Sequence, residues 1–319
     1  MDTVAAVDIG TNTCRMLIAA RRRGGGFIPL LKERAIVRLG KGYRTSSKMS
    51  DQSVTKGIKT LKEFSRKMRD CKVEKCSAVA TGVVRRALNA TEFLKKVKEE
   101  CNLPVKVISG EDEALLTLRG VELVFPAMKR KGSWLIFDIG GGSTELIYCE
   151  NGEVKIIESI DLGVVTLADL IESDPPLKKE LRVIEREIDR IFMPVAEKIK
   201  EQLNNKRPFL IGTAGTVTTL AAMDQALLEY QPEKINGFLL GKYAVQGMFN
   251  HLIKLQERER EGIPGLEKGR GKVIIPGCVI LLIIMDAFEA EGVSVSDSGL
   301  LEGIIRDLFD SLDTPDKLV

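Results

Sequence analysis

Two segments far apart in this chain repeat one pattern of residues. Residues 4–19 read VAAVDIGTNTCRMLIA, and residues 134–149 read WLIFDIGGGSTELIYC. They align without a gap, so that an apolar strand, an Asp-Ile-Gly turn and a second apolar strand recur, with Asp8 matching Asp138. Two apolar runs joined by a short glycine-containing turn are typical of a β-hairpin. A repeat of this kind predicts two copies of one fold.

A second pair of segments supports the duplication. Residues 76–82 read CSAVATG and residues 209–215 read FLIGTAG, each an apolar strand that ends in Thr and Gly. Between the strands lie helical patterns, one capped by Ser50 and one preceded by a capping-box pattern at residues 89–92. Each half is therefore expected to run hairpin, third strand, and then alternating helices and strands, which is a mixed α/β fold.

The repeat also predicts where the chain divides. A helix ends near Phe125 and Pro126, just before a basic segment. We expect an N-terminal domain at residues 1–126 and a C-terminal domain at residues 127–319. The final helix, from about residue 298 to 310, could pack back on the first domain.

The composition narrows the classes of function. The 319 residues carry 48 Lys and Arg against 45 Asp and Glu, so a net charge of +3 points to neither nucleic acid nor a membrane as partner. A single histidine excludes a multi-histidine metal site. Six scattered cysteines without a C-x-x-C pair indicate reduced core thiols. With no signal-peptide pattern and no apolar stretch of about 20 residues, we expect a cytoplasmic protein.

The two hairpin turns are the first candidates for chemistry. A glycine turn lets backbone N–H groups approach an anion, and hydroxyl side chains add donors. A tight turn without a ligand is the alternative for either turn alone, and the duplication argues against it. The predicted phosphate-binding residues are Gly10, Thr11, Asn12 and Thr13 in the first turn and Gly140, Gly141, Gly142, Ser143 and Thr144 in the second.

Three carboxylates accompany these turns. Asp8 and Asp138 each end the first strand of a hairpin, and Glu145 follows the second turn. A carboxylate beside a phosphate-binding loop is repelled by the ligand unless a cation lies between them. We therefore expect Asp8, Asp138 and Glu145 to bind Mg²⁺, directly or through water.

Two further signals fit phosphate binding. Arg15 lies on the same strand face as Thr13 by alternation, and the forked guanidinium groups of Arg15 and Arg85 suit phosphate oxygens. Solvated surface arginines are the alternative. Residues 212–216 read GTAGT, a strand end that leads into a helix whose N-terminal amides could bind a phosphate. The residues predicted from this segment are Gly212, Thr213, Gly215 and Thr216.

An acidic run opens another helix. Glu111, Asp112 and Glu113 follow a short strand and lie in the first helical turn. Acidic residues there usually interact only with the helix dipole. The local pattern does not select a catalytic residue among the three.

The motifs taken together resemble the exopolyphosphatase / guanosine-pentaphosphate phosphatase family, within the actin, sugar-kinase and heat-shock-ATPase superfamily. The resemblance implies two duplicated ribonuclease H-like domains, with mixed sheets flanked by helices and an active site in the interdomain cleft. The motifs that carry it are DIGTNTCR at 8–15, ATGVVRRALN at 80–89, VISGEDEA at 107–114, DIGGGSTEL at 138–146 and GTAGT at 212–216.

The resemblance also assigns roles. It implies that Glu113 is the general base that activates water, that Mg²⁺ is held near Asp138 and Glu145, and that the arginines and glycine turns bind the phosphates of inorganic polyphosphate or guanosine pentaphosphate. The sequence departs from the family at Leu301, where an arginine is frequent, and at Lys272, where an acidic residue is usual.

Longer family members carry an additional histidine-aspartate-type helical domain. This chain stops soon after the second half, so we expect activity on short phosphate chains with limited processivity.

Two other functions stay open at this stage. An ATP-dependent small-molecule kinase of the same superfamily would also clamp a nucleotide between two such halves. A non-enzymatic polyphosphate or nucleotide sensor would bind without turnover. The sequence separates neither polyphosphate from guanosine pentaphosphate nor a monomer from a homodimer.

Overall fold

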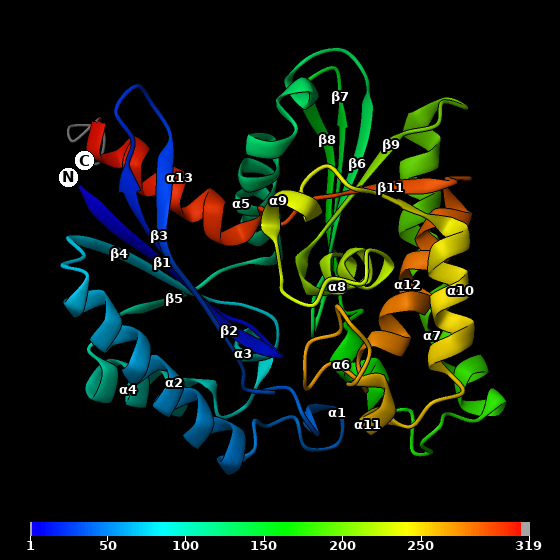
Figure 1. The fold of residues 1–319 in the computed structure, drawn as a ribbon, viewed down its shortest axis with the longest axis horizontal. Helices are drawn as coiled ribbons and strands as arrows, with labels where there is room; N and C mark the ends of the chain where they lie inside the picture. The colour runs from blue at the N-terminus through cyan, green and yellow to red at the C-terminus, as the bar shows by residue number, and fades with distance from the viewer. Residues whose placement is uncertain (1, 314–319) are drawn as a thin grey trace. The chain divides into compact units, whose positions relative to one another are not determined.

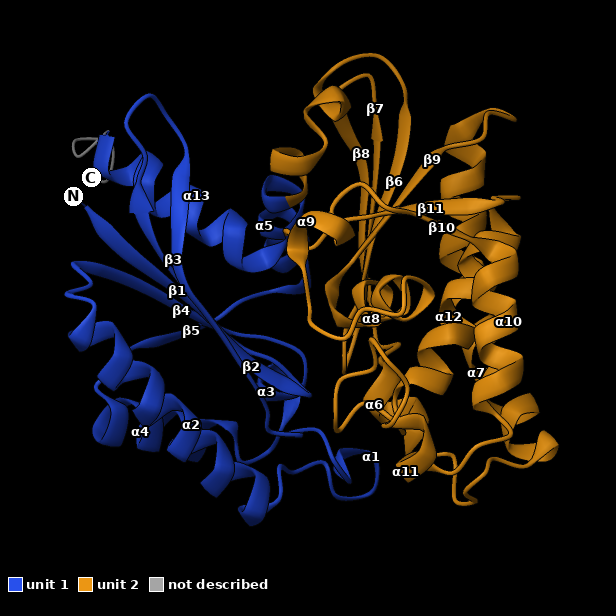
Figure 2. Cartoon of the chain, in the orientation of Figure 1, with its two compact units in different colours: residues 1–120, 299–319 blue, residues 121–298 orange. Residues whose placement is uncertain are grey.

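The structure, a computed structural model, describes residues 2–313 and comprises two compact units (Figures 1 and 2). Unit 1 contains residues 2–120 and 299–313, and unit 2 contains residues 121–298. The chain thus passes from one unit to the other at Gly120 and again at Gly299, whereas the sequence placed a single boundary between residues 126 and 127. The last helix belongs to unit 1.

Unit 1 is built on a five-stranded sheet in the order β3-β2-β1-β4-β5. Strands β1, β2 and β3 are antiparallel neighbours, while β4 is parallel to β1 and β5 is parallel to β4. The elements are β1 (Thr3–Ile9), β2 (Thr13–Arg21), β3 (Phe27–Ile36), α1 (Tyr43–Ser46), α2 (Asp51–Asp70), β4 (Lys75–Ala80), α3 (Val83–Arg86), α4 (Ala90–Cys101), β5 (Val105–Val107), α5 (Gly110–Val124), which continues into unit 2, and α13 (Leu300–Asp313).

Unit 2 repeats this topology with one strand added. Its six-stranded sheet has the order β10-β11-β9-β6-β7-β8, in which β10 is an extra antiparallel edge strand. The elements are η1 (Pro126–Lys129), β6 (Ser133–Ile139), β7 (Thr144–Glu150), β8 (Glu153–Ile160), α6 (Val164–Ala168), α7 (Lys178–Leu203), β9 (Phe209–Thr213), α8 (Ala214–Asp224), α9 (Pro232–Ile235), β10 (Leu239–Gly241), α10 (Lys242–Leu252), α11 (Glu257–Arg260), α12 (Ile274–Ala287) and β11 (Gly292–Val295). The predicted α/β fold with two duplicated mixed sheets is confirmed.

The apolar alternation in β1 explains how unit 1 is layered. Ala5, Val7 and Ile9 face a core cluster with residues of α2 and α4, whereas Val4 and Ala6 face a second cluster with residues of α13. Successive side chains of a strand point to opposite faces, so a strand apolar at every position is covered on both faces. Figure 1 shows α2 and α4 on one face of this sheet and α13 on the other.

Helix caps were predicted with mixed success. Ser50 caps α2, and its side chain accepts a hydrogen bond from the Ser53 amide. The capping box expected at residues 89–92 is wrong, because the Asn89 side chain instead exchanges two hydrogen bonds with the backbone of Met49. The Asn89 side chain therefore bonds to a distant segment and does not cap α4, although α4 begins at the expected place.

Helices α5 and α13 approach each other closely within unit 1. A Cβ on Gly120 would lie 1.9 Å from the Gly299 carbonyl oxygen, and a Cβ on Gly303 would lie 1.9 Å from the Leu116 carbonyl oxygen. Only glycine permits this contact. On the same helix Leu301, which stands where the family often has arginine, is buried in the core between α13 and the sheet.

All six cysteines are free thiols; Cys14, Cys101, Cys149 and Cys278 are buried, as expected for core residues, whereas Cys71 and Cys76 are only partly buried. Burial raises the pKa of Cys76, Cys149 and Cys278 to about 12. Among the described residues, no helix combines the length and the apolar character that a membrane span requires.

Candidate functional site

In unit 1 the predicted site residues gather at one edge of the sheet. The first turn follows β1, residues 81–86 follow β4, and the start of α5 follows β5. Because these strands are parallel, their carboxyl ends lie at the same edge, which is where open α/β sheets bind ligands. Hydrogen bonds join the first two segments: the Thr81 amide donates to the Ile9 carbonyl, and the Val83 amide donates to the Thr11 hydroxyl at 2.9 Å.

The first turn holds an ion pair. Arg15 and Asp8 are directly opposite in the β1–β2 ladder, and Arg15 donates to Asp8 Oδ2 through Nε at 2.9 Å and Nη2 at 2.7 Å. Asp8 is only 3% exposed, and its other oxygen, Oδ1, is buried without a hydrogen-bond partner. The same is true of Asn12 Oδ1. Buried polar oxygens without partners are costly, so a donor or cation at this turn would be favourable.

Arg85 and Glu113 lie side by side. Arg85 Nη1 donates to the Ile108 carbonyl at 3.1 Å and lies 3.5 Å from Glu113 Oε2. Glu113 is buried near the start of α5, so the structure brings the predicted base and a predicted phosphate-binding arginine together. Asp112 has a different role, because its amide donates to Ser109 Oγ and its carboxylate accepts from the Ser109 amide.

The second hairpin places two acids where the first has an ion pair. Asp138 and Glu145 are directly opposite in the β6–β7 ladder, at the positions that match Asp8 and Arg15. Both are buried, with exposed fractions of 7% and 1%. Glu145 accepts a hydrogen bond from Ser159 Oγ at 2.8 Å. Like charges directly opposite across a ladder repel each other, so this pair favours a cation.

Several predicted phosphate donors are used for folding instead. The Gly10 and Gly140 amides each close their own turn, donating at 3.0 Å to Thr13 O and Ser143 O. A Cβ at either glycine would come within about 3 Å of that same oxygen, so the lack of a side chain favours closure of the turn.

Three threonine hydroxyls that were predicted to bind phosphate also donate within the fold. Thr144 Oγ1 donates to the Leu162 carbonyl at 2.6 Å, and Thr216 Oγ1 donates to the Ile139 carbonyl at 3.1 Å. Thr213 Oγ1 is positioned to donate to the carbonyls of Ser296 and Ser298. These hydroxyls donate to backbone carbonyls of other segments, and sequence patterns do not reveal such hydrogen bonds.

The start of α8 has a neighbour that the sequence did not predict. A Cβ on Gly215 would lie 2.5 Å from both terminal nitrogens of Arg270, so the guanidinium lies against the first turn of the helix. Arg270 is buried and donates to Glu267 Oε2 at 2.8 Å. A helix N-terminus and a guanidinium are both positive, so an anion is favoured beside them. Ala214, which begins α8, has a left-handed φ of 66°, a strained conformation that is frequent at ligand sites.

The acidic residues fit Mg²⁺ in donor chemistry. Mg²⁺ is usually bound through one or two carboxylates, with water and substrate phosphate as the other ligands. Within unit 2, Asp138 and Glu145 supply such a pair. Within unit 1, Asp8 Oδ1 is a single buried oxygen without a hydrogen-bond partner. Within residues 2–313 no group of three His, Cys, Asp or Glu side chains could hold a metal ion by itself. The residues therefore suit a cation whose remaining ligands come from substrate and water.

Comparisons with known proteins agree with these features. Residues 17–312 match the model of the Ppx/GppA phosphatase family. The chain is similar to the Ppx/GppA family member from Aquifex aeolicus, at 30% identity over 97% of this chain and 98% of that chain, with a TM-score of 0.75. It is also similar to an exopolyphosphatase from Cytophaga hutchinsonii, at 27% identity over 97% of this chain and 98% of that chain, with a TM-score of 0.87. An exopolyphosphatase-like protein matches at 26% identity over 97% of this chain and 99% of that chain, with a TM-score of 0.86. The chain belongs to the Ppx/GppA phosphatase family.

Proposed function

We propose that this protein is a Mg²⁺-dependent phosphohydrolase that removes the terminal phosphate from inorganic polyphosphate, guanosine pentaphosphate or both. The observation that carries the proposal is the buried pair Asp138 and Glu145, opposite each other beside the second glycine turn. Two buried carboxylates at a turn that resembles a phosphate-binding loop favour a metal–phosphate ligand. The family, and the exopolyphosphatase among its similar structures, support phosphoanhydrides as the substrate class.

Glu113 is the proposed general base. It would orient a water molecule and accept its proton as the water oxygen attacks the terminal phosphorus and the bridging oxygen leaves with the shortened chain. Arg85, 3.5 Å from Glu113 Oε2, would bind the phosphate under attack and keep it beside the base. A base and an anion-binding group fixed on adjacent segments lower the entropic cost of positioning water and substrate.

Arg15 would also contact phosphate. Its guanidinium is partly exposed while it pairs with Asp8, so it can share its donors between that carboxylate and a ligand. Asp138 and Glu145 would hold Mg²⁺, which when bound neutralises charge on the phosphate oxygens. The amides at the start of α8, beside Arg270, would bind a further phosphate oxygen.

The test is phosphate release from polyphosphates of several lengths, guanosine pentaphosphate and ATP, each with and without Mg²⁺. The proposal expects Mg²⁺-dependent release from polyphosphate or guanosine pentaphosphate without any acceptor. A small-molecule kinase would release little phosphate in the absence of an acceptor. A sensor would bind these ligands and release none. Either of the last two results would overturn the proposed hydrolase.

A further inference from the structure

The segment between β3 and α2 is strongly basic and is not used by the motifs above. Residues 37–50 contain no acidic residue, and their charged side chains are Arg38, Lys41, Arg44 and Lys48. We call residues 37–50 the basic loop. It contains only one short helix, α1.

The basic loop is attached directly to the first turn. The amides of Val37 and Arg38 donate to the Asn12 carbonyl at 2.9 and 2.8 Å, and the Gly40 amide donates to the Thr11 carbonyl at 2.9 Å. The turn and the loop are therefore one bonded structure within unit 1.

Further contacts fix the backbone of the loop on its other sides. Ser53 Oγ donates to the Arg38 carbonyl at 3.0 Å, and the Leu88 amide donates to the Ser47 carbonyl at 3.0 Å. The Arg86 guanidinium lies 5.9 Å from the centre of the Tyr43 ring. Arg38 and Ser47 both have left-handed φ angles, of 60° and 52°. Non-glycine residues keep such angles only where the surrounding structure holds them, as it does at ligand-binding segments.

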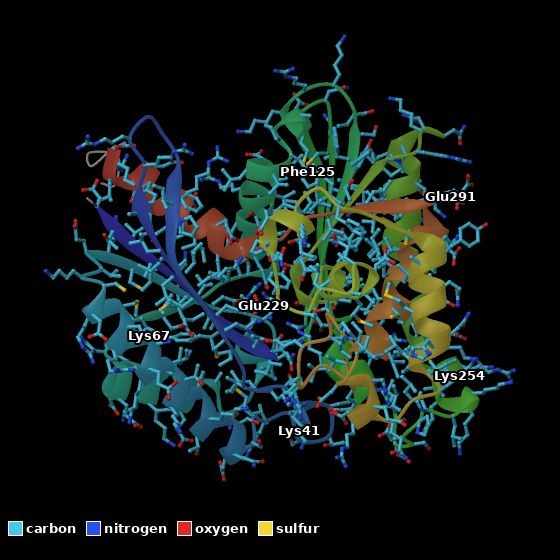
Figure 3. All side chains as sticks on the ribbon, in the orientation of Figure 1. Lys41, Lys67, Phe125, Glu229, Lys254 and Glu291 are labelled. Carbon is cyan, nitrogen blue, oxygen red and sulfur yellow. The ribbon has the colours of Figure 1, made fainter. Side chains whose placement is uncertain are left out.

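The loop presents its charges to solvent. Lys41, Arg44 and Lys48 are exposed, and Figure 3 shows Lys41 on the stretch that leads into α1. The exposed face of α2 and α4 differs, because some of its lysines pair with acids, as Lys62 does with Glu100 and Lys96 does with Glu92. A surface rich in one sign of charge attracts a polyanion, while a mixed surface does not.

We propose that the basic loop binds the phosphates of a linear polyphosphate that follow the terminal one, so that it sets a preference for substrates with several successive phosphates. This inference rests on the proposed function, and it differs from the sequence-based expectation of activity on short phosphate chains. Backbone hydrogen bonds join the start of the basic loop to the turn, and each successive phosphate adds negative charge along the polyphosphate chain. Exposed lysines on flexible stems suit such a ligand, because they require no fixed phosphate spacing.

The double variant Lys41→Gln/Lys48→Gln tests the loop, with Lys56→Gln/Lys59→Gln on the exposed face of α2 as the matched control. Both variants remove two exposed positive charges from unit 1. KM is measured for tripolyphosphate and for long-chain polyphosphate over a range of salt concentrations. Exposed charge pairs are worth little individually, so we expect KM for long-chain polyphosphate to rise roughly threefold to tenfold in the loop variant. KM for tripolyphosphate should rise less, and the salt dependence should become shallower.

Two results would overturn the proposal. One is an equal change in KM for both substrates in the loop variant. The other is an equal rise in KM for long-chain polyphosphate in the control variant, which would indicate a general effect of net charge. Binding of long-chain polyphosphate to each protein in a Glu113→Gln background separates this inference from the proposed hydrolase. If the native protein releases no phosphate, the proposed function fails, and weaker binding in the loop variant alone would still support the loop.

Discussion

Arg15 and Asp8 face each other across the first hairpin and are joined by two hydrogen bonds, while Asp138 and Glu145 occupy the matching positions of the second hairpin. The duplicated hairpins thus keep one backbone and differ in charge. The first carries an ion pair, and the second carries two acids that favour a cation. In the proposed function, Arg15 of the first hairpin binds phosphate, and the two acids of the second hairpin bind the metal ion.

The first prediction concerns the stability of this ion pair. Arg15→Ala leaves the carboxylate of Asp8 buried without its partner, so we expect a loss of about 1–3 kcal/mol in the free energy of unfolding. The sequence identifies Arg15 only as a candidate for phosphate binding. Urea denaturation checks the change, with the exposed Arg22→Ala as control. Adding Asp8→Asn to Arg15→Ala should restore part of the loss. Equal free energies of unfolding for Arg15→Ala and Arg22→Ala would contradict the prediction.

Glu180 carries the second prediction. Its carboxylate accepts hydrogen bonds from the amides of Glu172, Ser173 and Leu177 and from the Ser173 hydroxyl, and these bonds lower its pKa, the Leu177 amide most. Glu180→Gln should lower the free energy of unfolding by about 1–3 kcal/mol at neutral pH. Glu185→Gln, on the exposed face of the same helix, is the control.

The sign of the pH dependence follows from the direction of that shift. A carboxyl group whose pKa is lower in the folded state contributes stability above its unfolded pKa of about 4.3 and loses it as the pH falls through the folded value. The difference in stability between native protein and Glu180→Gln should therefore be constant near neutral pH and shrink in acid. A difference that grew on acidification would show that Glu180 is not stabilised as its ion.

The third prediction concerns the contact between α5 and α13. Gly120→Ala places a Cβ 1.9 Å from the Gly299 carbonyl oxygen, so the helices must move apart, at a cost of about 1–3 kcal/mol. Gly247→Ala is the matched control, because it lies in α10 with no atom near its Cβ, and alanine favours a helix by up to about 1 kcal/mol. Thermal unfolding measures the effect: Tm should fall in Gly120→Ala and should not fall in Gly247→Ala. A neutral Gly120→Ala would show that this contact is looser than described.

The sequence predicted the parts of the molecule that depend on local pattern. The repeated hairpins could be found because apolar alternation and an Asp-Ile-Gly turn are local. The ion pair of Asp8 with Arg15 was not predicted, although the two residues are opposite in that register. The hydroxyl partners of Thr144 and Thr216 could not be found, because they are backbone carbonyls of other segments. Arg270 was missed for the same reason, since only the folded chain places it against Gly215.

The last prediction separates the two acids at the start of α5. Asp112 exchanges hydrogen bonds with Ser109 and so caps the helix, whereas Glu113 is buried beside Arg85. Glu113→Gln keeps the size of the side chain and removes its ability to accept a proton from water. A general base typically contributes about 10²–10⁴-fold, so kcat for phosphate release should fall by that order while polyphosphate still binds.

Asp112→Asn is the matched control for this last variant. It should lower the free energy of unfolding by about 1 kcal/mol or less, because a single cap is affected, and leave kcat within a few-fold of native. Both kcat and binding are measured for each variant with the same polyphosphate. Equal losses of kcat at the two positions would mean that the variants disturb the start of α5 rather than the chemistry. Native turnover in Glu113→Gln would assign the base to another residue, because a glutamine there cannot take the proton of the attacking water.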